Sequence, residues 1–138
     1  MINSAKEFIS LLESKDLNQQ KRTRYENASE KVWFEIIESF PDHINDVVLN
    51  KTLPITVLRY LSKHSDPKIR WQVAIKRQLD IGLFEELAGD PDDSVRERIA
   101  YNRKAPKQVI EKLSHDSIER VAVIAKERLR ALENSEKK

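Results

Sequence analysis

Three histidines and one acidic run are the residues of this sequence whose chemistry could hold a metal ion. His43, His64 and His115 each stand singly, without a second ligand four residues away or a carboxylate at metal-binding spacing. The acidic run at residues 90–93 lacks the glycine and the downstream glutamate of a calcium-binding loop. We therefore interpret the histidines as exposed turn residues and the run as a helix start, and we expect no metal and no cofactor.

The common catalytic motifs are absent from the sequence. It contains no G-x-S-x-G, H-E-x-x-H, G-x-x-x-x-G-K or G-x-G-x-x-G pattern, and these patterns mark nucleophilic serines, zinc sites and phosphate-binding loops. The pair Glu85-Glu86 and the glutamates at 30, 35 and 38 are typical of solvated helix faces. We therefore expect a protein that is not an enzyme.

Two arginines, Arg70 and Arg96, occupy equivalent positions in two similar strings 26 residues apart. Their guanidinium groups could bind an anion or an acidic partner. Alternatively, each arginine pairs with an aspartate of its own or an adjacent segment, with Asp66, Asp90 and Asp92 as candidates. A planar guanidinium suits fixed bidentate pairing with a carboxylate, so the sequence favours the structural interpretation.

Basic and amide residues recur at the same spacing, near the ends of three predicted helices. Cations at these positions would complement the helix dipole. Three stacked groups would also form a basic strip able to bind a carboxylate-rich protein or a phosphate backbone. Both interpretations remain open for these groups, which are Asn50-Lys51, Lys76-Arg77 and Asn102-Arg103-Lys104.

A row of apolar and aromatic residues on the same helices is a second candidate surface. Trp71 and Ile75 lie four residues apart, Tyr101 falls in the Ile75 column, and Glu97 falls in the Trp71 column. If these helices line a concave face, Trp71 and Tyr101 could anchor a partner; plain packing between units is the alternative. The candidate partner-binding residues are therefore Lys51, Trp71, Ile75, Lys76, Arg77, Glu97, Tyr101, Asn102, Arg103 and Lys104.

An internal repeat of 26 residues determines the positions of these columns. When residues 53–78 are laid on residues 79–104, seven positions are identical. Each segment predicts two short helices, the first with apolar residues at i, i+1 and i+4 and the second with apolar residues at i, i+4 and i+5. Such a helix pair cannot bury its apolar stripes alone, so it must stack on a neighbour.

The repeat predicts an all-α fold of short helix pairs, with nine or ten helices in a single domain. We assign Trp33, within an apolar stretch, to the core. Prolines 54 and 106 are expected at the first position of their helices. The predicted segments are an N-terminal helical cap (1–28), four repeat units (29–52, 53–78, 79–104 and 105–130) and a frayed tail (131–138).

Composition and charge narrow the possible classes. The 138 residues include 25 basic and 23 acidic side chains, two glycines and no cysteine, which excludes a disulfide scaffold and a cysteine-based zinc site. Charged residues make up 35% of the chain, which favours a thin structure with much surface. No apolar run reaches the length of a membrane span, and no signal-peptide pattern opens the chain. We therefore expect a cytoplasmic monomer that does not bind a membrane.

The strings Asp66-Pro-Lys-Ile-Arg70-Trp-Gln-Val73-Ala74 and Asp92-Asp-Ser-Val95-Arg96-Glu-Arg-Ile99-Ala100 resemble the second half of HEAT-like repeats. More closely, they resemble the bacterial leucine-rich repeat variant type, an armadillo-like group of short helix pairs. The resemblance covers about residues 29–125. It departs at the arginine position of the first unit, near Ile44, and of the last unit, at Val121 or Ala122.

This resemblance implies a right-handed α-solenoid that binds macromolecules without chemistry. Small bacterial proteins of this kind include some that resemble immunity proteins of polymorphic toxin systems. We therefore expect a protein-binding repeat module, with neutralisation of a toxin as the most specific hypothesis. The alternative is a HEAT-like nucleic-acid-binding module that uses the basic edge, although the chain has few aromatic residues for base stacking.

Overall fold

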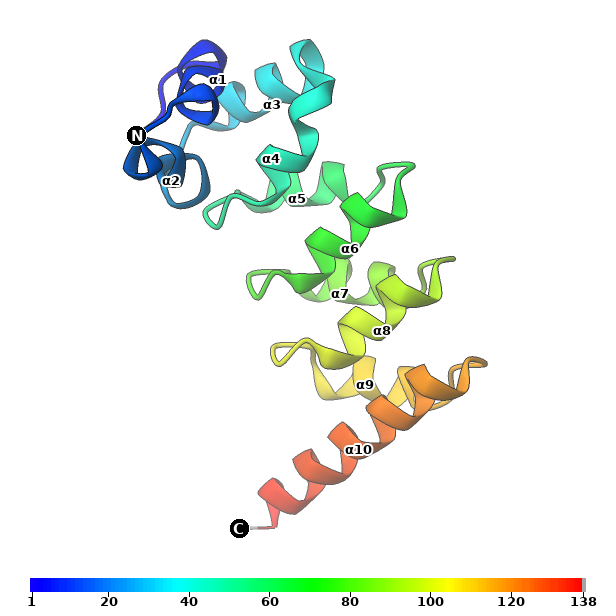
Figure 1. Cartoon of the computed structure of the whole chain (residues 1–138). Coiled ribbons are helices and arrows are strands. Elements are labelled where there is room, and N and C mark those ends of the chain that lie inside the picture. The colour runs from blue at the N-terminus through cyan, green and yellow to red at the C-terminus, as the bar shows by residue number, and fades with distance from the viewer. Residues whose placement is uncertain (138) are drawn as a thin grey trace. The chain divides into compact units, whose positions relative to one another are not determined.

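The computed structural model describes residues 1–137 and contains ten α-helices joined by short turns (Figure 1). Within these residues the only β-type contact is an isolated bridge between Ile2 and Ala28, and no strand forms. The predicted all-α class and the expected number of helices are therefore confirmed. No helix in the same range is long and apolar enough to cross a membrane.

The chain divides into two compact units, Met1–Lys63 and His64–Lys138. The prediction of one domain with four repeat units stays a prediction. The first unit contains α1 (Ala5–Glu13), α2 (Leu17–Tyr25), α3 (Glu30–Ser39), a 3-10 turn (Pro41–His43), α4 (Ile44–Val48) and α5 (Ile55–Leu61). The second contains α6 (Pro67–Ile75), α7 (Ile81–Ala88), α8 (Asp93–Tyr101), α9 (Lys107–Leu113) and α10 (Glu119–Glu136).

An aromatic pair lies in the core of the first unit. Phe8 of α1 and Trp33 of α3 are both fully buried, and their rings meet edge to face with centroids 5.7 Å apart. Serine hydroxyls begin both helices, because the Ser4 oxygen accepts the Glu7 N–H and the Ser29 oxygen accepts the Val32 N–H. The assignment of Trp33 to the core is confirmed.

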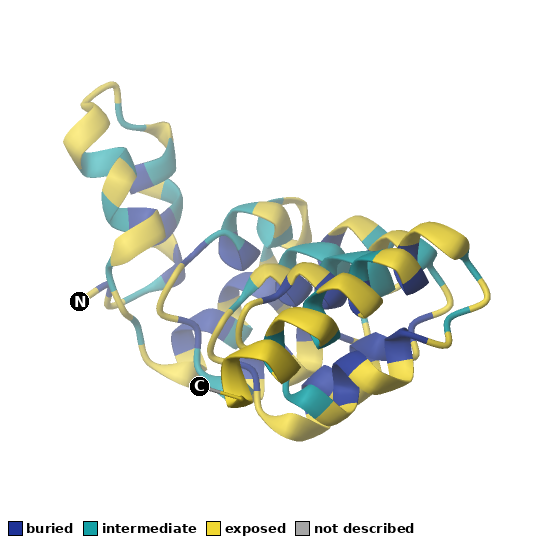
Figure 2. Cartoon of the chain, turned by 90° about the horizontal axis from the view of Figure 1, so that it is seen from below, coloured by how far each residue is buried: buried dark blue, intermediate teal, exposed yellow. Residues whose placement is uncertain are grey.

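The second unit follows the predicted stripes closely. The predicted apolar stripes of α7 and α9 are buried, and α8 packs between α6 and α10 while α7 packs on α9. Figure 2 shows buried positions, in dark blue, alternating with exposed positions, in yellow, around these helices. This alternation is the amphipathic pattern expected of helices that bury one stripe each.

Each arginine of the repeated column pairs with an aspartate 20 residues further along the chain. Arg70 donates two hydrogen bonds to Asp90, at 2.8 and 3.1 Å, and Arg96 donates two to Asp116, at 2.8 and 3.2 Å. The aspartate side chains are 4% and 7% exposed. Asp90 was one of the predicted partners, so the structural interpretation of this column is the one that the geometry supports.

Side-chain hydrogen bonds from the end of one helix pair, or from the equivalent position in α10, cap a helix that lies about 26 residues earlier in the chain. The Asn50 amide donates to the carbonyls of Thr23 and Glu26, and the Asn102 amide donates to those of Ala74 and Lys76, both at 2.8 Å. Arg128, 26 residues beyond Asn102, donates to the carbonyls of Ala100 and Asn102. These bonds satisfy carbonyl groups that a helix end leaves without partners.

Three predicted boundaries need correction. Pro54 and Pro106, predicted as the first helical residues, are N-cap residues, and their helices begin one position later, at Ile55 and Lys107. Helix α10 extends to Glu136, so the predicted tail (131–138) is helical as far as that residue, and Lys138 lies outside the described residues. An ion pair between Lys107 Nζ and a Glu136 carboxylate oxygen, 3.0 Å apart, joins this end of α10 to α9.

Candidate protein-binding surface

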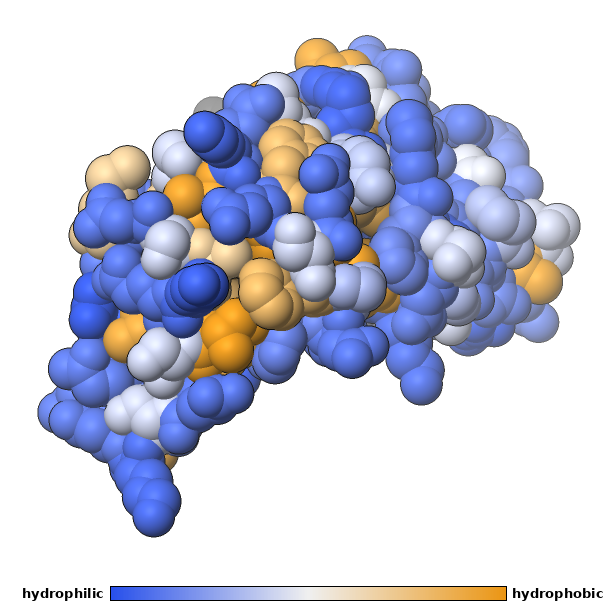
Figure 3. Space-filling model, turned by 90° about the horizontal axis from the view of Figure 1, so that it is seen from above, coloured by the Kyte–Doolittle hydropathy of each residue, from blue (hydrophilic) through white to orange (hydrophobic). Residues whose placement is uncertain are grey.

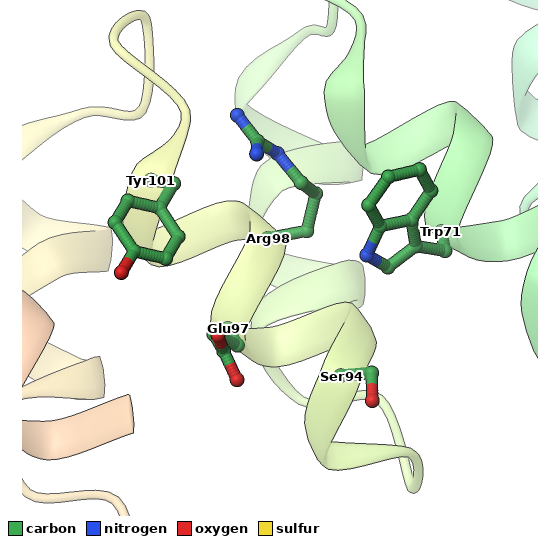
Figure 4. A pocket seen from close by; sticks show the side chains of 5 residues that line it. All are labelled: Trp71, Ser94, Glu97, Arg98 and Tyr101. Carbon is green, nitrogen blue, oxygen red and sulfur yellow. The ribbon is translucent and has the colours of Figure 1, made fainter. Parts of the chain in front are cut away.

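An open hollow of about 200 Å³ lies between α6 and α8 (Figure 4). Trp71 comes from α6, and the other four lining residues come from α8. Residues at positions 94, 97, 98 and 101 follow the i, i+3, i+4, i+7 spacing that places side chains on one helix face. The buried stripe of α8 therefore faces the core while this second stripe lines the hollow. The four α8 residues are Ser94, Glu97, Arg98 and Tyr101.

Arg98 is the basic residue of this hollow and packs against Tyr101. Its guanidinium carbon lies 5.6 Å from the centre of the Tyr101 ring, a cation–π contact. Its Nε atom is buried and has no hydrogen-bond partner among residues 1–137. Figure 4 shows the Arg98 side chain between Tyr101 and Trp71, with Glu97 pointing away from the guanidinium.

A second, wider hollow of about 530 Å³ lies between α8 and α10 and shares Glu97 and Tyr101 with the first. Arg120 crosses it by pairing with Glu97 at 2.5 Å and with Asp93 at 2.7 Å. The hydrogen bonds that Arg120 donates to Asp93 and to Glu97 raise its pKa. The remaining lining residues are Glu119, Val123, Ile124 and Glu127.

Of the residues predicted from sequence for the aromatic row, the structure brings Trp71, Glu97 and Tyr101 together around the first hollow. Tyr101 is 49% exposed. Ile75 is partly exposed on α6 and lines neither hollow. The alignment of the internal repeats did not identify Arg98, because the equivalent residue 26 positions earlier is Gln72. An alignment that looks for recurring residues does not detect a residue that occurs in one repeat alone.

The residues predicted to form a basic strip have different environments. Asn102 is only 2% exposed, and its amide caps α6, so we leave it out of any partner-binding surface. Lys76 is half-buried, whereas Arg77, Arg103 and Lys104 are exposed on the loops after α6 and α8. Lys51 is exposed in the first unit.

The exposed cations of the second unit form what we call the basic edge, defined by Arg77, Arg103 and Lys104. Figure 1 shows the loops after α6 and α8 on the same side of their helices. Burial, followed by the nearby charge of Arg103, lowers the pKa of Arg128, whose guanidinium donates to the carbonyls of Ala100 and Asn102. Like charges are therefore close together here, a condition that an anionic partner would relieve.

Apolar side chains reach the surface in small groups. On the face shown in Figure 3, hydrophobic residues, in orange, lie in a few clusters between hydrophilic ones. Val123 of the second hollow is 43% exposed and Ile81 is 55% exposed. Among residues 1–137, no three histidine, cysteine, aspartate or glutamate side chains are grouped closely enough to hold a metal ion.

Comparisons with protein-family models, curated proteins and solved structures found no match to this chain.

Proposed function

We propose that this chain is a protein-binding module, without enzymatic chemistry, that contacts its partner through the face formed by α6, α8 and α10. The observation that carries this proposal is the pair of adjoining open hollows that share Glu97 and Tyr101. Small-molecule substrates usually bind in cavities that enclose them. Two shallow, open hollows side by side are better suited to receive side chains from the surface of another macromolecule.

Trp71 and Tyr101 are the proposed anchors of the interaction. Large aromatic side chains that remain accessible on a rigid helix bury much apolar area when a partner docks, and they lose little conformational freedom. Both rings line the first hollow. The Arg96–Asp116 ion pair fixes α8 to the turn before α10. The helix that carries Tyr101 is therefore held in place before a partner binds.

The mixed charges of this face favour a protein over a nucleic acid. Glu119 and Glu127 line the second hollow beside Arg120, and their carboxylates would repel a phosphate backbone. A protein segment can place both acidic and basic side chains against such a surface.

Nucleic-acid binding is the second candidate function, and the basic edge is the observation that favours it. Arg77, Arg103 and Lys104 are exposed, and Arg128 adds a fourth positive charge next to Arg103. A set of four cations is small for a dedicated nucleic-acid-binding surface, so we rank this function second.

A toxin protein is the partner to test first, because of the resemblance to HEAT-like proteins that include immunity proteins. The proposal also includes right-handed stacking of the helix pairs. The side-by-side packing of α6, α8 and α10 within the second unit supports a stack but leaves its handedness as a proposal.

The experiment measures binding of a candidate toxin domain to the full chain. We expect a 1:1 complex whose affinity falls at least tenfold when Trp71 and Tyr101 are both changed to alanine. The matched control is Tyr25→Ala, which removes a tyrosine that is 61% exposed in the first unit. Duplex DNA is the second probe, assayed at several salt concentrations.

An unchanged affinity in the folded Trp71→Ala/Tyr101→Ala variant would contradict the proposed face. Binding of duplex DNA that weakens steeply with salt and is lost on Arg77→Gln/Arg103→Gln/Lys104→Gln would instead establish the second function.

A further inference from the structure

We propose that Arg98 binds one aspartate or glutamate side chain of the partner protein, so that the partner presents an acidic residue to the hollow between α6 and α8. This inference rests on the proposed function and specifies the chemistry that the partner must have at this site.

The first reason is the unpaired guanidinium. Arg70, Arg96 and Arg120 each bind carboxylates, and Arg128 binds two backbone carbonyls. Arg98 instead has a buried Nε without a hydrogen-bond partner in residues 1–137, and a ring contact with Tyr101. A buried donor without a partner destabilises the free protein, and the terminal Nη groups of Arg98, which no ion pair within residues 1–137 engages, can bind an incoming acceptor.

The second reason is that hydrogen-bond donors predominate among the polar groups that line the hollow. The Trp71 indole N–H and the hydroxyl groups of Ser94 and Tyr101 line the same hollow, and no hydrogen bond to another described side chain engages them. The one carboxylate of the hollow, Glu97, pairs with Arg120. A site with several donors and an occupied acceptor is complementary to an anionic, acceptor-rich group.

The third reason is geometry. A guanidinium presents parallel N–H groups that match the two oxygens of a carboxylate. The flat rings of Trp71 and Tyr101 on either side of Arg98 (Figure 4) limit the directions from which an anion can approach. A hollow of about 200 Å³ has room for a single side chain, not for a run of phosphates with their sugars.

The adjoining hollow excludes an extended polyanion. Glu119 and Glu127 stand there, and the nearest cation, Arg120, is held by Glu97 and Asp93. A partner that places an acidic residue against Arg98 must therefore continue with neutral or basic residues towards α10. Proteins can alternate charge in this way, whereas nucleic-acid backbones cannot.

The test selects short random peptides from a displayed library on the full chain and keeps those whose binding is lost with Trp71→Ala. The indole N–H resonance of Trp71 in NMR spectra reports whether a synthesised peptide enters the hollow. Dissociation constants are then measured with wild-type protein, Arg98→Gln, Arg98→Glu and the control Arg103→Gln, which removes the same charge from the basic edge.

We expect the selected peptides to share an aspartate or glutamate. Replacing it by the matching amide weakens binding about tenfold or more, Arg98→Gln weakens binding equally, and the two changes together cost no more than either alone. Exchanging the peptide acid for lysine restores binding to Arg98→Glu. Arg103→Gln leaves the affinity within about twofold. If Arg98→Gln fails to fold, Arg98→Lys tests the same point, with a loss of several-fold expected because the bidentate geometry is removed.

This inference would be overturned by Trp71-dependent peptides that contain no shared acidic residue, or by peptides whose dissociation constants do not change with Arg98→Gln. Either result would leave the protein-binding function intact. A library that yields no Trp71-dependent peptide would overturn the proposed face itself. Duplex DNA that shifts the Trp71 resonance in wild-type protein but not in Arg98→Gln would overturn the inference in favour of a phosphate ligand.

Discussion

The two units of this chain are stabilised by different means. The second unit repeats one arrangement of polar bonds every 26 residues: the Arg70–Asp90 and Arg96–Asp116 pairs and the caps from Asn102 and Arg128. The first unit has the Asn50 cap, but it also contains two edge-to-face aromatic pairs, Phe8–Trp33 and Phe34–Tyr60, and a group of ion pairs around Arg22 and Glu26. The same class of fold therefore tolerates loss of the ladder where large side chains fill the core.

The series of Arg–Asp pairs, which we call the ladder, ends before Arg70, and at the preceding repeat positions both the arginine and the aspartate are replaced. Ile44 stands in the column of Arg70 and Arg96, and His64 stands in the column of Asp90. His64 retains one hydrogen bond that the aspartate makes in the next repeat. Its Nδ1 accepts the Asp66 N–H, just as an Asp90 oxygen accepts the Asp92 N–H. An aspartate at this half-buried position would carry a charge without an arginine to pair with, which would destabilise the fold. A histidine can accept the same hydrogen bond without placing a permanent negative charge there.

The largest expected effect is in the first unit. Trp33→Ala removes a fully buried ring and its contact with Phe8, so we expect the free energy of unfolding to fall by about 3–5 kcal/mol. Denaturant titration of the full chain measures the loss, and hydrogen exchange locates it in residues 1–63.

The matched control is Trp33→Phe, which keeps a ring and removes an indole N–H that is buried without a partner. It should cost clearly less than the alanine variant. Equal losses in the two variants would show that the aromatic pair does not account for the stability of the first unit.

Breaking the ladder comes next. Asp90→Ala leaves the Arg70 guanidinium, whose side chain is 13% exposed, without its carboxylate, and we expect a loss of about 3 kcal/mol. The control is Asp66→Ala, which removes an N-cap from α6 and should cost about 1 kcal/mol. Denaturant titration compares the two, and an Asp90→Ala loss no larger than that of Asp66→Ala would mean that the pair contributes little.

The smallest expected effect is a loss of stability in acid. The hydrogen bond from Arg22, followed by that from the amino group of Met1, lowers the pKa of Glu26 to about 2. Burial raises the pKa of Asp116, but the bonds from Arg96 and the Ile118 N–H outweigh it and leave that pKa below its ordinary value. Both groups are ionised more readily in the folded state, so their contribution is complete above the unfolded pKa, about 4, and declines as the pH falls through the folded pKa.

We therefore expect the thermal midpoint to fall between about pH 4.5 and pH 2, with a shallower fall in Glu26→Gln for the signals of the first unit. Glu13→Gln is the control, because this exposed glutamate has no ion pair with residues 1–137. Identical pH profiles for the two variants would contradict the assigned role of Glu26.

Much of the fold follows from local sequence patterns. Helical spacing of apolar residues placed the helix pairs of the repeat, with shifts of one residue at Pro54 and Pro106. The recurrence of Arg70 and Arg96 indicated a ladder, because repeated columns mark repeated contacts. The predicted tail failed at residues 131–136, since the bond from Lys107 to Glu136 connects residues 29 positions apart.

The candidate site depended far more on tertiary structure. The sequence by itself determined that Trp71, Glu97 and Tyr101 share related helix positions, because a helix converts spacing into direction. It could not separate buried Asn102 from exposed Arg103 beside it, and it gave no sign that Arg98 lacks a partner. Which polar groups are paired is decided only when α6, α8 and α10 pack together, since hydrogen bonds between helices depend on distances that local sequence does not encode.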